Sequence, residues 1–327
     1  MEELLNKIVY HAMLKKATDI HFYCEKCCTI RLRIHGSLER YETLDKSEGL
    51  KLMNYLKYIS HINMNYQLLP QTGHFQYLCD HKFVYCRVSY LPTTKYESIV
   101  MRLLDDSVTF KIDQLSLQNN ILEFYHWLLK QKSGLFLISG PTGSGKSTTL
   151  YTLLQELAKD EKKNIITIED PVEINVKGCI QVETNEKLGL DDHIILNQIL
   201  RHDPDVVMIG EIRDEKTAQL ALTCALTGHM VLATIHAGNA IMTLKRLLNL
   251  HISSLDVLDV IIGIVSQRLY YEESKQRIIV LSELLTKDHI KEYLQQGRTN
   301  YQDFQYAIEE LINSGVDAKV FQGELYE

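Results

Sequence analysis

Hydrophobic and polar positions follow different patterns in the two parts of this chain. An amphipathic helix opens the sequence, with apolar residues recurring every three or four positions between Leu4 and Met13. Short runs with strand-like alternation follow, and one more helical stretch lies among them. The expected strands are 20–23, 29–34, 74–79, 83–90 and 98–103, and the expected second helix is 47–60. This pattern predicts an α+β domain over residues 1–105, followed by a polar linker over 106–116.

From Leu117 onward, wholly apolar strand-like runs alternate with amphipathic helices. The expected strands are 135–139, 165–168, 206–209 and 230–234, and the expected helices are 147–158, 191–201 and 215–226. Continuously apolar strands separated by helices are typical of a parallel sheet that is covered on both faces. We therefore predict an α/β domain over 117–327, with helical sequence after about residue 285. Ligands bind such sheets at the carboxyl ends of the strands.

A glycine-rich loop follows the first of these apolar strands. Residues 140–147 satisfy every fixed position of the motif G-x-x-x-x-G-K-[ST], and they lie between an expected strand and an expected helix, as the motif requires. Glycine lets the backbone wrap phosphate groups with its N–H donors. Lys146 would reach the β- and γ-phosphates, and Ser147 would reach Mg²⁺. The predicted ATP-binding residues are Gly140, Pro141, Thr142, Gly143, Ser144, Gly145, Lys146, Ser147 and Thr148.

Two of the later strands end in acidic residues. The strand 206–209 leads to Glu211, which suits the acidic residue that holds Mg²⁺ in phosphate-loop enzymes, although a solvated turn would give the same pattern. After the strand 165–168, three carboxylates lie within five residues, and Glu173 is the last of them. A carboxylate here could accept the proton of an attacking water, and an acidic turn that contains proline is the alternative.

Two histidines and two arginines complete the set of candidate residues. His229 and His236 stand on either side of the strand 230–234, where each could sense a phosphate or serve only in packing. Arg87 and Arg102 lie on neighbouring expected strands of the N-terminal domain. A guanidinium commonly neutralises charge on a transferred phosphoryl group, so both could reach a nucleotide across a domain or subunit boundary. Surface salt bridges are the alternative.

Composition narrows the possible classes of function. The 327 residues are 45% hydrophobic, which suits two domains with large cores, and the net charge of −7 disfavours bulk binding of nucleic acid or of an anionic membrane. We expect no secretory signal and no transmembrane segment, hence a cytoplasmic protein with peripheral membrane contact at most. The seven cysteines should be reduced thiols, because their number is odd and the chain is long and without a signal. A zinc site is not expected, because Cys24 and Cys27 lack the second close pair that it needs.

Together these motifs resemble those of the secretion ATPases of type II secretion, type IV pili and competence pseudopili. In that family the phosphate loop is followed by an aspartate box, a Walker B segment that ends in Gly-Glu-x-Arg-Asp, and a histidine box. The matching segments of this chain are 168–173, 210–214 and 227–236. The segments 87–93 and 100–104 resemble the strands that carry the arginine fingers of the family. The resemblance implies a RecA-like phosphate-loop ATPase domain with a parallel-rich sheet, preceded by a smaller, PAS-like α+β domain.

The resemblance also implies roles for the residues near the phosphate loop. Lys146 would bind the phosphates of ATP, Glu173 would be the general base, and Glu211 and Ser147 would hold Mg²⁺.

By the resemblance, the remaining candidates would couple the nucleotide state to domain movement or stabilise the transition state of ATP hydrolysis. By the resemblance, His229 and His236 would link the nucleotide state to domain position, and Arg87 and Arg102 would be the arginine fingers. The family works as homo-hexameric rings in which ATP hydrolysis moves an integral-membrane platform protein.

Departures from the family pattern indicate one branch. The second domain lacks the tetracysteine zinc module of many relatives, and a long N-terminal extension is not expected. A short form of this kind looks most like the competence-pseudopilus assembly ATPase of low-GC Gram-positive bacteria, which supports DNA uptake without binding DNA itself. A type IV pilus retraction or assembly motor and a RecA-like DNA translocase are the alternatives. A small-molecule kinase and a non-hydrolysing binding module fit the motifs less well.

Overall fold

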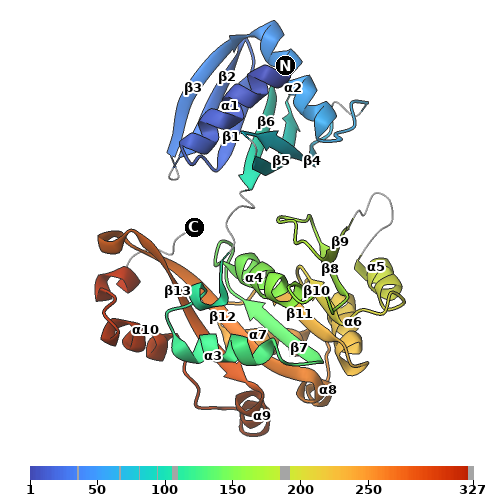
Figure 1. Cartoon of the computed structure of the whole chain (residues 1–327), viewed down its shortest axis with the longest axis vertical. Helices are drawn as coiled ribbons and strands as arrows, with labels where there is room; N and C mark the ends of the chain where they lie inside the picture. The colour runs from blue at the N-terminus through green and yellow to red at the C-terminus, as the bar shows by residue number, and fades with distance from the viewer. Residues whose placement is uncertain are drawn as a thin grey trace. The chain divides into compact units, whose positions relative to one another are not determined.

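The computed structural model of the chain describes residues 1–34, 37–65, 68–80, 82–93, 95–104, 110–184 and 192–322. The chain divides into two units, Met1–Val108 and Thr109–Glu327. Each unit has its own sheet (Figure 1). Each also has its own hydrophobic core.

The first unit is a six-stranded antiparallel sheet with the helices α1 and α2 on one face (Figure 1). Its strand order is β3-β2-β1-β6-β5-β4. The strands are β1 (Asp19–Cys24), β2 (Cys27–Ile34), β3 (Ser37–Asp45), β4 (Gln71–Cys79), β5 (Lys82–Pro92) and β6 (Glu97–Leu104). The helices are α1 (Glu2–Leu14) and α2 (Lys46–Ile59).

Buried and more exposed side chains alternate along the strands of this sheet, so one face packs on the helices and the other face is polar. On β1, the side chains of Ile20, Phe22 and Cys24 are buried together with apolar residues of α1 and α2, and the residues between them point to the other side. The helix α2 begins after Asp45, whose carboxylate accepts a hydrogen bond from Glu48 N at 2.9 Å, as expected of an N-cap.

The second unit contains a seven-stranded sheet in the order β13-β12-β7-β11-β10-β8-β9. β12 and β13 pair antiparallel, and the other neighbouring strands pair parallel. The strands are β7 (Gly134–Ser139), β8 (Ile165–Glu169), β9 (Cys179–Glu183), β10 (Val206–Ile209), β11 (Met230–Ile235), β12 (Ile261–Glu272) and β13 (Arg277–Thr286).

Helices cover both faces of this second sheet. Leu135 and Leu137 of β7 are buried with residues of α5, α6, α7 and α8, whereas Phe136 and Ile138 are buried with residues of α3 and α4. A strand that is buried on both faces must be apolar throughout, which explains its sequence. The helices are α3 (Asn119–Leu128), α4 (Lys146–Ala158), α5 (Asp192–Ile199), α6 (Glu215–Leu226), α7 (Ala240–Asn249), α8 (Ser254–Val260), α9 (Lys287–Gln296) and α10 (Phe304–Asn313).

The predicted α/β fold class, with a parallel-rich sheet preceded by a smaller α+β unit, is confirmed. The expected linker 106–116 lies partly outside the described residues. Within its described part, Ile112 and Leu115 are each 4% exposed and belong to the core of the second unit. Residue 191, where we expected a helix to begin, and the chain end 323–327 also lie outside the described residues.

In the described part of the chain, no helix is both long enough and apolar enough to cross a lipid bilayer.

Candidate nucleotide-binding site

The glycine loop connects the end of β7 to the start of α4. Gly140 and Gly143 have φ angles of 147° and 78°, and Gly145, the N-cap of α4, has a φ of 83°. A Cβ at position 140 would lie 2.4 Å from both the carbonyl oxygen of Gln267 and the Oγ of Ser144, so only glycine fits there. The loop therefore brings the N-terminus of α4 to the carboxyl edge of the sheet, where backbone N–H groups attract an anion.

Polar groups of this loop suit a phosphate. Ser144 Oγ is buried and has no hydrogen-bond partner among the described residues. Lys146 is 9% exposed, and its Nζ donates to the carbonyl oxygens of Gly140 at 3.0 Å and of Pro141 at 2.7 Å. A phosphate in the loop would offer a charged acceptor to both side chains, so the residues present fit a nucleotide.

The predicted magnesium ligands are a hydroxyl and a carboxylate. Ser147 is exposed in the first turn of α4, with Thr148 next to it and Thr142 exposed in the loop. Among the residues that the structure describes, no cluster of three or more His, Cys, Asp or Glu side chains could hold a metal by itself. Mg²⁺ usually keeps several waters and phosphate oxygens and needs one or two protein ligands, so Ser147 and Glu211 fit this ion.

Glu211 is the centre of a chain of polar contacts at the same edge of the sheet. Parallel pairing brings the carboxyl ends of β8, β10, β11 and β7 together. His236 Nε2 lies 3.1 Å from Glu211 Oε1, and Arg213 Nε donates to Glu211 Oε2 at 2.8 Å. Arg213 also donates from Nη1 to Asp170 Oδ2 at 3.1 Å. The segments after β8, β10 and β11 are thus joined by side chains.

Lys146 lies within electrostatic reach of both predicted catalytic acids. Burial lowers the pKa of Lys146, and the carboxylates of Glu211 and Glu173 act in the opposite direction. The structure therefore brings Lys146, Glu173, Glu211 and His236 to one edge of the sheet, although they come from four separate segments of the sequence.

A buried carboxylate, Glu169, fixes the backbone beside Glu173. Glu169 is 4% exposed and accepts hydrogen bonds from Thr167 Oγ1 at 2.6 Å, from Gln181 Nε2 at 3.0 Å and from the hydroxyl of Tyr151. Tyr151 Oη in turn accepts a hydrogen bond from Glu173 N at 3.1 Å. Burial raises the pKa of Glu169, and these hydrogen bonds oppose that shift. The sequence singles out neither Tyr151 nor Gln181, because both look like ordinary residues of a helix and a strand.

His229 lies at the opposite edge of the sheet from His236, so the packing alternative applies to His229. His229 precedes Met230, the first residue of β11, whereas His236 follows the last one. Its Nδ1 lies 2.9 Å from Cys224 O and 3.0 Å from Thr227 Oγ1, at the end of α6. Since the intervening strand separates the two histidines by roughly 20 Å, His229 serves the end of a helix and not the phosphate loop.

The two predicted arginine fingers form a direct cross-strand pair in the first unit. Arg87 on β5 stands opposite Arg102 on β6, and both side chains are exposed. Arg102 Nε donates to Asp19 Oδ1 at 2.9 Å. Arg87 forms no ion pair with any of the described residues. Thus the ion-pair alternative applies to Arg102, and among the described residues the terminal nitrogens of that side chain have no acceptor.

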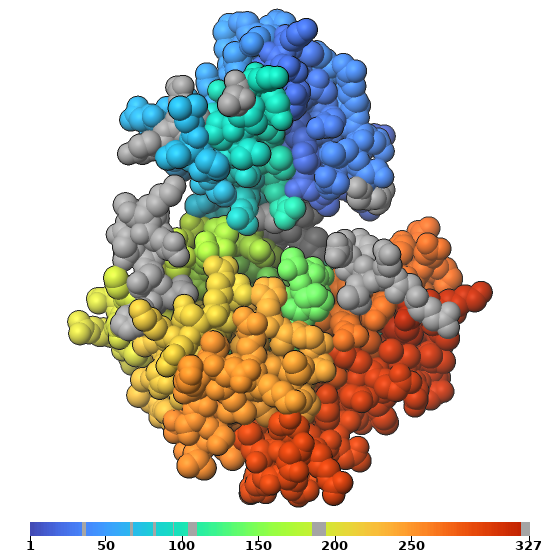
Figure 2. Space-filling model, turned by 180° about the vertical axis from the view of Figure 1, so that it is seen from behind, coloured from blue at the N-terminus to red at the C-terminus, as the bar shows by residue number. Residues whose placement is uncertain are grey.

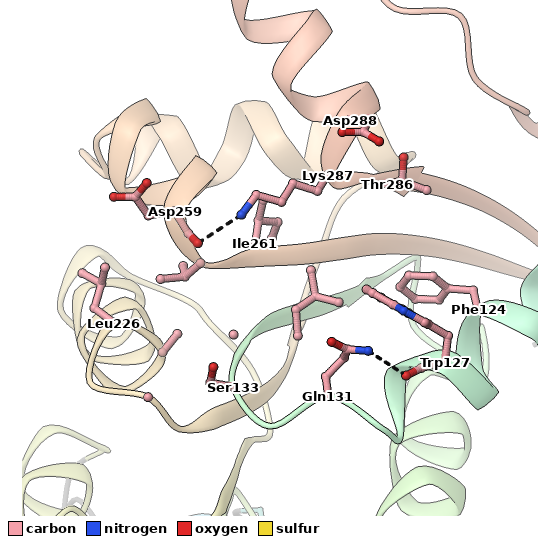
Figure 3. A pocket seen from close by; sticks show the side chains of 15 residues that line it. Phe124, Trp127, Gln131, Ser133, Leu226, Asp259, Ile261, Thr286, Lys287 and Asp288 are labelled. Carbon is pink, nitrogen blue, oxygen red and sulfur yellow. Dashed lines mark hydrogen bonds between the residues drawn. The ribbon is translucent and has the colours of Figure 1, made fainter.

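A separate cleft of about 810 Å³ lies at the amino edge of the second sheet, between the starts of β7 and β12 and the ends of α3, α6 and α8 (Figure 3). Trp127 and Leu226 line it and are 47% and 49% exposed. Lys287 reaches across to donate from Nζ to Asp259 O at 3.2 Å (Figure 3). The predicted ATP-binding residues, all of them described, lie at the other edge of the sheet.

A phosphate loop between a buried strand and a helix, with carboxylates at the same edge of a parallel-rich sheet, defines a phosphate-loop nucleotide-binding protein. The chain belongs to the family described as type II/IV secretion system protein, which matches residues 1–316. The predicted resemblance to secretion ATPases is therefore confirmed, and so is the prediction that the chain is an ATPase.

Three relatives show how far the similarity extends. Competence protein ComGA of Bacillus subtilis (strain 168) is 33% identical over 334 residues, which are 97% of this chain and 94% of ComGA. Type II secretion system protein E of Xanthomonas campestris pv. campestris is 39% identical over 268 residues, which are 81% of this chain but 47% of that protein. The chain thus spans about half the length of the latter. The crystal structure of the pilus retraction motor PilT with bound ADP superposes with a TM-score of 0.75 at 25% identity, covering 95% of this chain and 94% of PilT.

Proposed function

We propose that this chain is the ATPase that drives assembly of a competence pseudopilus, a filament of the type II secretion and type IV pilus kind, in support of DNA uptake. It works as a homo-hexamer at the cytoplasmic face of the membrane, where ATP hydrolysis moves an integral-membrane platform protein. The observation that carries the proposal is the similarity to ComGA over nearly the whole length of both chains, combined with a phosphate loop and acidic residues at one sheet edge.

The glycine loop and the first turn of α4 bind the phosphates of the nucleotide. The backbone N–H groups there, together with Ser144 Oγ, donate to the phosphates. Lys146 exchanges its two carbonyl acceptors for the β- and γ-phosphates. Since carbonyls are weaker acceptors than phosphates, this exchange favours the bound state.

Ser147 and Glu211 are the proposed ligands of Mg²⁺, which when bound neutralises charge on the β- and γ-phosphates. His236 and Arg213 hold the Glu211 carboxylate between them, so its orientation is fixed before a nucleotide arrives. His236 is also the histidine that can report the state of the site, because it follows the strand next to the phosphate loop.

Glu173 is the proposed general base. Its carboxylate accepts the proton of the attacking water while the water oxygen bonds to the γ-phosphorus, and the bond between that phosphorus and the oxygen bridging it to the β-phosphate breaks to release ADP. Its backbone position is set by the hydrogen bond to Tyr151 Oη, and Tyr151 is itself anchored on Glu169. Arg87 and Arg102 of a neighbouring subunit are the proposed groups that neutralise the charge on the transferred phosphoryl group.

The likeness to PilT favours a second candidate function, a motor for pilus retraction. Both functions use the same ATP site, so they differ in what the filament does and not in the chemistry.

The proposed chemistry is tested by steady-state hydrolysis of Mg-ATP together with the mass of the protein in light scattering. We expect a hexamer with slow turnover, and we expect Glu173→Gln to bind ATP but to lose hydrolysis by at least about 100-fold. Glu156→Gln is the matched control, since Glu156 is a carboxylate on the surface of α4 whose ion-pair partner, among the residues that the structure describes, is Lys159 alone. Normal turnover by Glu173→Gln would refute the base assignment, and a monomer under all nucleotide conditions would refute the ring.

The proposed biological role is tested by transformation with added DNA. In the bacterium that carries this chain, replacement by the Glu173→Gln form should abolish transformation, and the Glu156→Gln form should leave it unchanged. A strain that loses ATPase activity but still takes up DNA normally would contradict the competence role.

A further inference from the structure

A row of four charged residues and one histidine, called the charged row, crosses five strands of the sheet in the first unit. Residues that stand directly opposite each other on antiparallel strands point to the same face of the sheet. The row lies on the face opposite α1 and α2, because the alternating neighbours of its members are buried against those helices. In the strand order β2-β1-β6-β5-β4, the row consists of Arg33, Asp19, Arg102, Arg87 and His74.

Asp19 is the one carboxylate of this row, and it is buried between two guanidinium groups. Its side chain is 5% exposed, against 59% for Arg102 and 36% for Arg33. Asp19 Oδ1 accepts from Arg102 Nε at 2.9 Å, while Oδ2 accepts from Thr18 Oγ1 at 2.8 Å and lies 3.8 Å from Arg33 Nε. Like charges on neighbouring strands repel each other, so Asp19 offsets the repulsion among the arginines.

The way in which Arg102 is held leaves most of its donors available. A guanidinium carries five N–H donors in a planar fork, and Arg102 uses only the single donor on Nε to bind Asp19. Its two terminal nitrogens have no acceptor among the described residues. Such an anchored guanidinium is pre-organised for a second, bidentate partner, and phosphate oxygens match its geometry.

The neighbouring row shows that this face of the sheet is short of acceptors. His21 and Arg31 stand opposite each other on β1 and β2. His21 Nε2 and Arg31 Nε are both buried without a hydrogen-bond partner in the part of the chain that the structure describes. Burial lowers the pKa of His21, and Arg33 adds to that effect. The face therefore carries an excess of positive charge and of donors, which suits a polyphosphate.

We propose that Asp19 is a positioning residue for phosphoryl transfer. It holds Arg102 through Nε so that both terminal nitrogens are presented to the phosphates of ATP, and Arg33, held by the same carboxylate, supplies a further guanidinium to the same anion-binding row. The inference rests on the proposed function, in which Arg102 acts as an arginine finger. It assigns to Asp19 a role in orientation and to Arg33 a contact with phosphate.

A double-mutant cycle separates this role from a purely structural ion pair. Single-turnover release of labelled phosphate is measured for the wild type, Asp19→Asn, Arg102→Ala and the double variant, all as the full chain. We expect Arg102→Ala to lower the rate by at least about 100-fold and Asp19→Asn to lower it about tenfold, with KM for ATP changed less than about twofold. In the Arg102→Ala background, Asp19→Asn should change the rate by less than about twofold, because Asp19 acts through Arg102.

Glu97→Gln is the matched control. Glu97 is a carboxylate of the same sheet, paired with the buried Lys57 at 2.6 Å outside the charged row, and its replacement should leave the rate unchanged.

Because Asp19 is buried, Arg33→Gln provides a second test at a half-exposed position that tolerates substitution. We expect it to lower the rate about threefold at an unchanged melting temperature. A wild-type rate in Arg33→Gln would overturn the contact assigned to Arg33.

The remaining outcomes separate the inference from the proposed function. A tenfold loss from Asp19→Asn in both backgrounds would overturn the positioning role, because Asp19 would then act independently of Arg102. A loss in Arg102→Ala with a full rate in Asp19→Asn would overturn the role of Asp19 alone. A full rate in Arg102→Ala would overturn the finger assignment itself, and the role of Asp19 with it.

Discussion

Glu283 shows how one residue can join the loop next to the ATP site to the C-terminal helices. This side chain is 2% exposed, and its carboxylate accepts hydrogen bonds from the backbone N–H groups of Ala240, at the start of α7, and of Phe304, at the start of α10. Arg268 reinforces the link, since it donates from Nη2 to Gly238 O at 3.1 Å and its guanidinium lies 4.1 Å from the centre of the Phe304 ring. The loop that carries His236 is thus tied to α10.

The protonation of Glu283 should make stability depend on pH. Burial raises the pKa of Glu283 from 4.5 to about 7, although the two backbone hydrogen bonds and Arg268 act to lower it. Between about pH 4.5 and 7 the folded chain therefore binds more protons than the unfolded chain. The free energy of unfolding therefore falls as the pH rises through this window. Glu283→Gln removes this titrating group. Between pH 5 and pH 8, the free energy of unfolding of the variant, measured in denaturant titrations, should therefore fall by about 2 kcal/mol less than that of the wild type.

Glu156→Gln serves as the control for this measurement, because it removes a carboxylate from the surface of the same unit. Equal losses in the wild type and in Glu283→Gln would show that Glu283 does not titrate in this range.

At the scale of elements, a glycine lets the helix α2 pack close against the strand β2 of the first sheet. A Cβ on Gly49 of α2 would lie 2.1 Å from the Cβ of Cys28 on β2. Alanine stabilises a helix interior by about 1 kcal/mol relative to glycine, but two Cβ atoms at this distance would force the helix away from the strand, at a cost of about 1–3 kcal/mol or more. The steric cost exceeds the gain in helix propensity.

We therefore expect Gly49→Ala to lower the melting temperature by several degrees, as measured by the loss of helical circular dichroism. Lys51→Ala, at an exposed position of the same helix, should leave it nearly unchanged. A Gly49→Ala chain at least as stable as the wild type would mean that α2 and β2 can separate at little cost.

The sequence predicts best the strands whose residues are buried on both faces and are therefore apolar throughout. The central strands of the second unit are apolar throughout, and they lie where the pattern puts them. The sequence does not predict β3, β9, β12 and β13. β3 is an edge strand with mostly exposed residues, so it shows no alternation. β12 carries the buried polar residues Ser266 and Gln267 within an apolar run, and the sequence alone does not separate it from α8.

For the candidate site, the sequence predicts the positions of the main residues but not the side chains that hold them. Motif spacing predicts that Lys146, Glu173, Glu211 and His236 each follow an apolar strand, and in the structure they come after β7, β8, β10 and β11. It does not show which partners hold them, since those contacts join segments far apart in the sequence. Asp19, opposite Arg102, is of this kind: only strand register brings it beside that arginine.

At the scale of the whole molecule, the ATP site and the row of arginines belong to different units of the chain. In the proposed ring, the arginines of one chain would complete the ATP site of the next.

We expect Lys146→Ala and Arg102→Ala each to be inactive alone, because one loses the phosphate-binding lysine and the other the finger. Mixed rings should regain hydrolysis at those interfaces where an Arg102→Ala chain supplies the phosphate loop and a Lys146→Ala chain supplies the arginine, roughly a quarter of them in an equal mixture. Steady-state hydrolysis after co-refolding measures this rescue, and mass measurement verifies the mixing. Verified mixed rings without activity would exclude a finger that acts in trans.

The cleft beside Trp127 gives this protein a built-in optical reporter. The chain contains one tryptophan, and that residue lines the cleft at the edge of the sheet away from the phosphate loop. Intrinsic fluorescence excited at the indole band therefore reports on this cleft, without a label. A compound that fills the cleft would alter that emission while leaving the phosphate loop open, so added ATP would not displace it. A screen based only on displacement of a nucleotide would miss such a compound, whereas the fluorescence of Trp127 would detect it.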